Sequence, residues 1–336
     1  MQFIKILALA GFFVIFLFNT GCKSDPSHST TAKTEDLQPV PVPKFNRDSA
    51  FSFVEKQVEF GPRVPNTDAH RQCKDWLVNQ FKSYGLTVLE QDFKATAYTG
   101  KTLHGTNIMA QYKPEAPRRI LLAAHWDSRH IADSPLSTER RDEPILGADD
   151  GGSGVGVLLE IARQLQAHPT EVGVDLLLFD AEDHGDDNDQ NPNPESWCLG
   201  SQYWSKNMVP SGYHPKYGIL LDMVGAKNAR FPKEGVSMTY APAVMNKVWK
   251  LAKNLGYGSY FTETKSGAIT DDHYFVNTIA GVPMIDIINK AGNTQTGFGP
   301  HWHTHNDNMH VIDIRTLRAV GQTLLEVIYR EAAGRF

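Results

Sequence analysis

The sequence lacks an excess of positive charge, an apolar run long enough to span a bilayer, and internal repeats. Its 336 residues carry a formal net charge of −5, and the absence of a basic stripe argues against nucleic acid as a partner. The one long apolar run, Ile6 to Phe18, is shorter than the roughly 20 residues that a membrane-spanning helix needs. Because no repeat or break in composition divides the chain, we expect a single domain over residues 44–336.

The N-terminal segment is typical of a bacterial secretory signal rather than of a folded element. Lys5 precedes the apolar run, and Gly21-Cys22 follows it. This ending resembles a lipoprotein signal, in which residues 1–21 are removed and Cys22 is acylated; the alternative is a plain cleaved signal. Residues 22–43 are rich in Ser, Thr and Pro, which predicts a disordered tether. We therefore expect a periplasmic protein held at a membrane by a lipid anchor.

Cysteine is scarce. If Cys22 is acylated, Cys73 and Cys198 are the two cysteines that remain. An oxidising compartment would allow them to pair, but the sequence does not tell whether they are close in space. We expect two buried free thiols.

Strand-like and helix-like segments alternate along the rest of the chain. Apolar or alternating runs predict strands at 86–93, 106–112, 118–128, 173–179, 218–223 and 282–288. Helical periodicity predicts helices at 48–61, 66–85, 152–169, 200–208, 243–254 and 315–332. The expected caps of the first two helices are Asp48 and either Asn66 or Thr67. This alternation predicts an α/β fold, a three-layer sandwich in which helices flank a largely parallel sheet.

Acidic and histidine side chains recur where the predicted strands end. In open α/β sheets, ligands bind beyond the carboxyl ends of the strands, so these side chains are candidates for one site. The set comprises His125, Asp127, Asp149, Asp150, Asp180, Glu182, Asp183, Asp222, Asp271, Asp272, His273, His301, His303 and His305. Carboxylates gathered at one edge need a cation, and carboxylates with imidazole suit zinc.

Two patterns leave the choice of ligands open. In "HWHTH", His301, His303 and His305 alternate and would share one face of an extended segment, so the pattern does not choose among them. Residues 186–193 weakly resemble a calcium loop, but Pro192 stands where the loop needs Gly and the final Glu is missing. We expect that stretch to be a solvated insertion.

Several motifs in fixed order resemble the zinc aminopeptidase superfamily, family M28. They are "HWDSR", "GADDGGSGVGVLLEIAR", "LLFDAEDHG", "LGSQYW", "LLDMVGA", "TDDHYF", "GVPMIDII" and "WHTHNDN". The resemblance is greatest to the cyclising branch, the animal-type glutaminyl cyclases. It implies a zinc exopeptidase-like sandwich around a mixed sheet, and conversion of the N-terminal glutamine of peptides or proteins to pyroglutamate with release of ammonia.

The resemblance also implies roles for individual residues. The implied ligands of a single zinc are Asp150, Asp183 and His303. The implied acid/base residue is Glu182, and the implied paired acids near the substrate are Asp222 and Asp271. The implied walls of the pocket are Trp302 and Trp197. Two positions depart from the pattern: Asp183 stands where most relatives carry Glu, and Thr270 stands where the animal cyclases carry Gln.

A two-zinc aminopeptidase is the alternative function. Its five ligand positions are filled, by His125, Asp150, Asp183, Asp222 and His303. A peptidase must activate water, whereas in cyclisation the substrate's own amine is a tethered nucleophile, so one zinc suffices. Three features favour the cyclase by resemblance: the double acid of "TDDH", the Trp before His303 and the motif "LLDMVGA". A third possibility, an inactive binding lipoprotein, would be expected to lack Glu182 or a ligand. We expect the enzyme to be a monomer.

Overall fold

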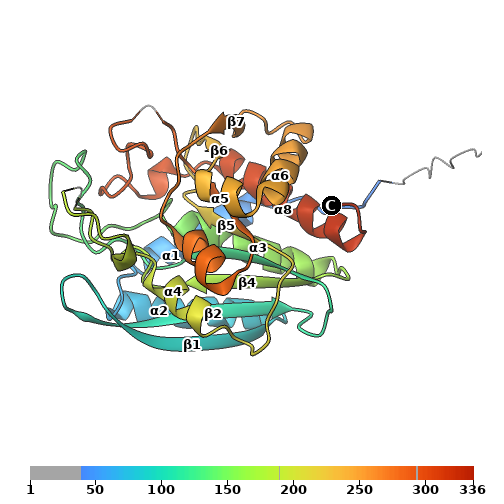
Figure 1. Ribbon diagram of the computed structural model, residues 1–336, viewed down its shortest axis with the longest axis horizontal. Coiled ribbons are helices and arrows are strands. Elements are labelled where there is room, and N and C mark those ends of the chain that lie inside the picture. Colours follow the sequence, from blue (N-terminus) through green and yellow to red (C-terminus); the bar gives the residue numbers. More distant parts are fainter. Residues whose placement is uncertain (1–38, 189, 293) are drawn as a thin grey trace, which may run out of the picture. The chain divides into compact units, whose positions relative to one another are not determined.

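The computed structural model describes residues 39–188, 190–292 and 294–336 (Figure 1). The predictions for the signal at 1–21, for Cys22 and for the tether up to residue 38 lie outside the described residues. Residues Val40–Phe336 form one unit. No helix in the described part of the chain is long and apolar enough to cross a membrane.

A six-stranded mixed sheet with the order β1-β2-β4-β3-β5-β8 forms the middle layer. Its strands are β1 (Thr87–Thr96), β2 (Thr102–Tyr112), β3 (Arg119–His125), β4 (Gly173–Phe179), β5 (Gly218–Asp222) and β8 (Met284–Ile288). The pairs β1-β2 and β2-β4 are antiparallel, and β4, β3, β5 and β8 run parallel to one another. The strands β6 (Phe231–Lys233) and β7 (Phe261–Lys265) pair in parallel and form a separate two-stranded sheet.

Helices cover both faces of the sheet (Figure 1). They are α1 (Arg47–Glu59), α2 (Asp68–Ser83), α3 (Gly152–Ala167), α4 (Leu199–Lys206), α5 (Gly235–Tyr240), α6 (Pro242–Asn254), α7 (Asp272–Phe275) and α8 (Ile314–Ala332). The main core contains buried residues of α1, α2, α3, α6 and α8, and a second core on the opposite face contains Trp204 of α4. The predicted fold class, an α/β three-layer sandwich, is confirmed.

The central strands are buried on both faces, as their continuous apolar runs predict. Every residue of β3, β4 and β5 is buried. Neighbours along a strand face opposite layers: Leu122 and Leu176 belong to the main core, whereas Leu121 and Leu177 pack with the second one. Because these strands are packed on both faces, their carboxyl ends have fixed positions. The loops that follow them, which carry the acidic and histidine side chains, therefore begin at fixed points.

Several details differ from the sequence-based expectations. The N-cap of α1 is Asn46, not Asp48, because the Asn46 side chain accepts hydrogen bonds from the backbone N–H groups of Asp48 and Ser49. Thr67 caps α2. The short elements β6, β7, α5 and α7 were not predicted, since 3 to 6 residues are too few to show a period. Cys73 and Cys198 are free and buried, as expected.

Candidate metal centre and active-site pocket

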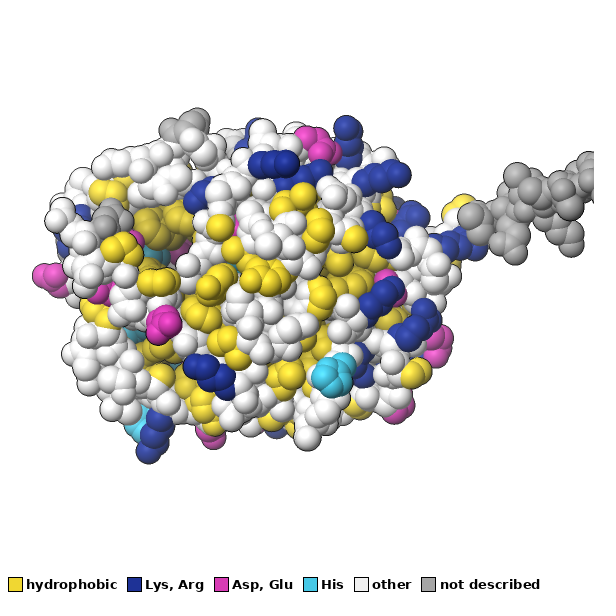
Figure 2. All heavy atoms as spheres, viewed as in Figure 1, with side chains coloured by type: hydrophobic (Ala, Val, Ile, Leu, Met, Phe, Trp, Pro, Cys, Tyr) yellow, Lys and Arg dark blue, Asp and Glu magenta, His cyan; other side chains and the backbone are white. Residues whose placement is uncertain are grey.

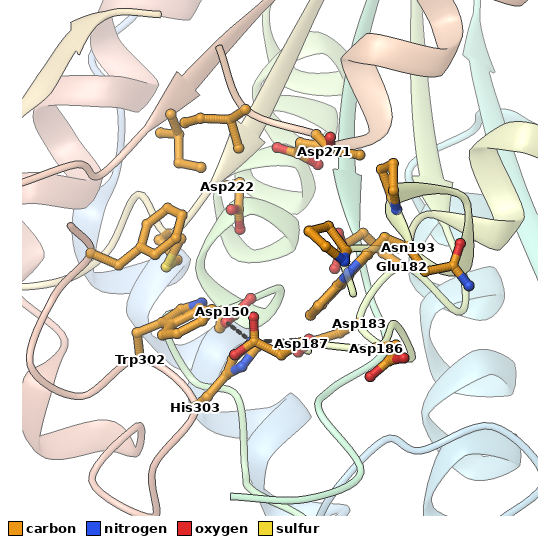
Figure 3. Close-up of a pocket in the computed structure, with 18 of the residues that line it drawn as sticks. Asp150, Glu182, Asp183, Asp186, Asp187, Asn193, Asp222, Asp271, Trp302 and His303 are labelled. Atoms are coloured by element: carbon orange, nitrogen blue, oxygen red, sulfur yellow. Dashed lines mark ion pairs between the residues drawn. The ribbon is translucent and has the colours of Figure 1, made fainter. Parts of the chain in front are cut away.

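The polar residues that follow the parallel strands meet around one pocket of about 470 Å³. Figure 2 shows a hollow at the left of the molecule, where hydrophobic, acidic and histidine side chains lie close together. The pocket is lined by all eight residues of the implied site: Asp150, Glu182, Asp183, Trp197, Asp222, Asp271, Trp302 and His303. Segments from five separate parts of the chain supply them (Figure 3).

Asp150, Asp183 and His303 form a cluster with the spacing of metal ligands. Nε2 of His303 lies 3.1 Å from Oδ1 of Asp183 and 3.7 Å from Oδ2 of Asp150. Donors bound to one tetrahedral zinc lie about 3.4 Å apart. Both carboxylate oxygens of Asp183 are buried without a hydrogen-bond donor. An orphaned buried carboxylate beside a second carboxylate and an imidazole fits zinc.

The electrostatics of this cluster also favour a cation. Burial raises the pKa of Asp183 to about 6, and the neighbouring Asp150 adds to the rise. Burial acts against the charged form of His303, but the carboxylates of Asp183 and Asp133 raise the pKa of this imidazole to about 9. A bound metal ion would replace the proton of the imidazole as the partner of the carboxylates.

A second cluster lies beside the first. Nε2 of His125, at the end of β3, is 3.1 Å from Oδ1 of Asp150 and 3.2 Å from Oδ1 of Asp222, at the end of β5. One ligand atom from each of the three lies within 4.8 Å of the others. The five ligand positions of a two-metal centre are therefore close together in space, with Asp150 shared between the two clusters.

The three histidines of "HWHTH" have separate surroundings. Nε2 of His301 lies 2.8 Å from Oδ2 of Asp149, and Nε2 of His305 lies 3.0 Å from the backbone oxygen of Arg140. Among the three, His303 alone belongs to the metal cluster, and it adopts a left-handed backbone conformation with φ of 53°. The structure thus distinguishes three positions that the alternating pattern could not.

Two buried aspartates, whose roles the sequence did not reveal, hold the loops that carry the clusters. The Asp127 carboxylate accepts hydrogen bonds from the backbone N–H groups of Glu182 (3.1 Å) and Asp183 (3.2 Å). The Asp307 carboxylate likewise accepts from the N–H groups of Asp149 (2.7 Å) and Asp150 (3.1 Å). The only signal in the sequence was the position of Asp127 near the carboxyl end of a predicted strand.

Glu182 lies beside the three candidate metal ligands Asp150, Asp183 and His303 but does not belong to that group. Its side chain is 12% exposed, and the thiol of Cys198 is 3.3 Å from its Oε1. Burial, followed by the charges of Asp183 and Asp271, raises the pKa of Glu182 well above its ordinary value, although His125 opposes the rise. A carboxyl group with a raised pKa at the wall of a pocket suits proton transfer.

Asp222 and Asp271, the implied paired acids, both line the pocket, and each has a further ionisable neighbour. Oδ1 of Asp222 lies 3.2 Å from Nε2 of His125, and the charges of Asp150 and Asp271 add to the rise that burial causes in the pKa of Asp222. Another acid, Asp286, lies beside Asp271: one ligand atom from each of Asp271, His273 and Asp286 lies within 4.8 Å of the others, and burial together with the charge of Asp271 raises the pKa of Asp286 well above its ordinary value. Sequence reasoning missed Asp286, although an acid inside the apolar strand β8 was a signal.

Aromatic residues and an exposed insertion complete the pocket. The Trp302 ring stacks on His303 at 3.7 Å between centroids, and Phe298 packs on Trp302 at 4.9 Å. The Trp197 ring is nearly parallel to that of His303, with 6.0 Å between the ring centroids. The described residues of 186–193, which exclude residue 189, are largely exposed, as expected of a solvated insertion, but several of them also line the pocket. The lining residues that sequence reasoning missed include Met223, Ile269, Ile288 and Phe298.

Comparison with known proteins adds to this geometry. Residues 107–328 match the family described as Peptidase family M28. The chain belongs to this family. The resemblance seen in the motifs is thereby confirmed, and the matched region contains all eight residues of the implied site.

Relatives in the M28 family include cyclases and exopeptidases. The glutaminyl cyclase of Bacteroides thetaiotaomicron, solved with N-acetylhistamine bound, is 49% identical, with a TM-score of 0.83 over 86% of this chain and 99% of that one. A Zn-dependent exopeptidase from Parabacteroides distasonis is 50% identical, with a TM-score of 0.84 over the same shares. The glutaminyl-peptide cyclotransferase of Drosophila melanogaster is 26% identical over 76% of this chain and 73% of its own length.

Proposed function

We propose that this M28 protein is a zinc-dependent glutaminyl-peptide cyclotransferase. It converts the N-terminal glutamine of peptides to pyroglutamate and releases ammonia. The observation that carries the proposal is the position of Glu182 and Asp271. Their carboxylates come within 4.8 Å of each other in the pocket, and neither belongs to the cluster of Asp150, Asp183 and His303. Two acids outside the candidate ligand cluster can move and hold protons, and a metal ion held by that cluster would supply a Lewis acid for a carbonyl group.

The residues divide the chemistry among them. Zinc held by Asp150, Asp183 and His303 would supply a Lewis acid for the γ-carbonyl oxygen of the glutamine. Glu182 accepts a proton from the attacking α-amine and returns it to the departing ammonia. Asp271 accepts a hydrogen bond from the amide nitrogen and so orients the leaving group.

The aromatic walls have a separate task. Trp302 and Trp197 flank the glutamine side chain and keep water from it. Because the amine and the amide belong to one substrate, orientation by the pocket provides much of the rate acceleration.

The proposal includes one zinc per chain. In cyclisation the nucleophile is the substrate's own amine, so no second metal is needed to activate water. His125 then remains hydrogen-bonded between Asp150 and Asp222, as its distances of 3.1 and 3.2 Å to them allow. Elemental analysis of the purified protein is the test, and two tightly held zinc ions per chain would contradict this part.

A two-zinc aminopeptidase is the second candidate, because the cluster of His125, Asp150 and Asp222 is intact. Incubation with a Gln-initiated dipeptide and, separately, with an aminoacyl dye distinguishes the two. A cyclase releases ammonia and blocks the N-terminus of the dipeptide. A peptidase frees the dye. A protein that does neither is a binding protein, and that outcome would contradict both candidates.

We also propose the location and the assembly state of the enzyme. It is a monomer in the periplasm, attached to a membrane through an acyl group on Cys22. The support is the sequence alone: Lys5, the apolar run from Ile6 to Phe18, and Gly21-Cys22. The tether at 22–43 leaves the catalytic domain free to reach peptides in solution.

A further inference from the structure

Arg129, in the segment that follows β3, has a fully buried guanidinium group close to the pocket. Its Nη1 donates to the backbone oxygens of Asp183 (3.1 Å) and Gly185 (2.9 Å). Its Nε and Nη2 donate to the two carboxylate oxygens of Asp133. The group also lies 4.6 Å from the centre of the Trp197 ring. One side chain thus contacts three different parts of the site.

The contact with Asp133 extends to the metal cluster. Oδ1 of Asp133 is 3.2 Å from Nε of Arg129 and 3.2 Å from Nδ1 of His303. This contact is an ion pair without hydrogen-bond geometry, and a carboxylate on the Nδ1 side of the imidazole leaves Nε2 facing the other two candidate ligands, as is usual around metal-bound histidine. Arg129 therefore acts on His303 through Asp133, and on Asp183 both through its backbone oxygen and through the charge of Nη1, which lies 3.8 Å from Oδ1 of Asp183.

Trp197 packs tightly against the loop at Gly185. The backbone oxygen of Gly185 accepts from Arg129, and a Cβ atom at Gly185 would lie 2.0 Å from the Trp197 ring. The indole is therefore packed against the loop that Arg129 holds, with the guanidinium near its face as a cation–π partner. Any shift of the loop would move this wall of the pocket.

We propose that Arg129 is a positioning residue that couples two of the three zinc ligands to the aromatic wall. The guanidinium has the planar fork of donors that this task needs, with two for a carboxylate and others for backbone oxygens, whereas lysine has a single ammonium group. The metal part of the inference depends only on the ligand set. The substrate part rests on the proposed function.

The chain offers a matched control in Arg119. Its Nε and Nη2 bind the carboxylate of Asp175, and its Nη1 donates to backbone oxygens, as Arg129 does. Arg119 begins β3, at the opposite end of the strand from the pocket. A substitution at Arg119 therefore shows how much the loss of such a guanidinium group destabilises the fold without touching the pocket.

The experiment compares Arg129→Lys with Arg119→Lys in the full chain. Zinc affinity is measured by competition with a chelator, thermal stability by the unfolding midpoint, and kcat and KM for a Gln-initiated dipeptide at saturating zinc. For Arg129→Lys we expect zinc affinity to fall by about 10–100-fold. Saturating zinc should restore kcat to within a few-fold, while KM stays raised because Trp197 has lost its partner. For Arg119→Lys we expect a lower unfolding midpoint with unchanged zinc affinity and KM.

Wild-type zinc affinity in Arg129→Lys would overturn the inference, and so would equal losses of zinc affinity in both variants. If Arg129→Lys does not fold, Asp133→Asn tests the inference instead, because asparagine has nearly the same shape as aspartate. For this variant we expect the same loss of zinc affinity without the rise in KM. Unchanged zinc affinity in Asp133→Asn would contradict us. A wild-type protein that binds zinc but forms no pyroglutamate would disprove the proposed function, while the zinc measurement would still test Arg129.

Discussion

Glu182 and Asp183 are neighbours in the sequence, but their side chains have different surroundings. The Asp183 carboxylate faces His303 at 3.1 Å, and its oxygens lack hydrogen-bond donors. The Glu182 carboxyl faces Cys198 at 3.3 Å and lies near Asp271. Adjacent side chains on an extended segment point in different directions, so one acid can bind a metal ion while the other carries protons.

This separation predicts a crossed result for two variants. Asp183→Ala should lose much of its zinc affinity, because one of three protein ligands is gone, and added zinc should partly restore activity. Glu182→Gln should keep its zinc, while its cyclisation rate falls by about 10²–10⁴-fold. Zinc stoichiometry and rate are measured for both. If Glu182→Gln loses zinc and Asp183→Ala keeps it, the two roles are reversed.

Glu234 predicts a pH-dependent contribution to stability. Its buried carboxylate accepts hydrogen bonds from the backbone of Val236, Ser237 and Ile269 and lies 2.9 Å from Nε2 of His273. Burial acts against the charge, but the bonds from His273 and the backbone lower the pKa of Glu234 to about 2. The stabilisation is therefore complete above the unfolded-state pKa of about 4.3 and is lost as the pH falls toward 2.

Glu234→Gln should lower the free energy of unfolding by about 1–3 kcal/mol at neutral pH. The difference from the wild type should shrink as the pH falls below the unfolded-state value. Urea unfolding over a series of decreasing pH values measures it. A difference that stays constant with pH would show that the charge of Glu234 contributes nothing.

Among the secondary-structure elements, the central strands could be predicted from the sequence. The side-chain contacts that connect one element to another could not. The apolar run of β4 predicts a strand, and the acids that follow it predict that a site lies at the end of that strand. Both predictions need only residues that are adjacent in the sequence. The roles of Arg129, Asp127 and Asp286 depend on residues that lie far away in the sequence. The Asp127 carboxylate, for example, meets the N–H groups of Glu182 and Asp183 only once β3 and β4 are paired. No local pattern encodes such a contact.

The link between β3 and the loop after β4 can be tested at Asp127. Asp127→Asn keeps the size of the side chain but offers one acceptor oxygen to two backbone N–H groups. We expect the loop to loosen, zinc affinity to fall by about 10–100-fold and the cyclisation rate at limiting zinc to fall with it. Chelator competition measures the affinity. Unchanged affinity would mean that the paired strands alone fix the loop.

At the scale of the molecule, the whole pocket lies within residues 40–336. Val40 and Val42 pack against the main core, so the folded unit already includes the last four residues of the proposed tether at 22–43. Cys22→Ser should therefore remove the protein from the membrane fraction, or leave it unprocessed, with kcat/KM unchanged. Cell fractionation, mass spectrometry of the N-terminus and the cyclisation assay measure these effects. Wild-type protein found wholly soluble and without an acyl group would contradict the anchor.

The central claim is that the pocket closes a ring within its substrate instead of adding water. The most direct test is to incubate the wild-type enzyme with a Gln-initiated peptide in water enriched in heavy oxygen, and to weigh the product by mass spectrometry. We expect a product lighter than the substrate by one ammonia, with no heavy oxygen incorporated and one ammonia released per peptide. Heavy oxygen in the carboxyl group of a released amino acid, with no pyroglutamate formed, would contradict it.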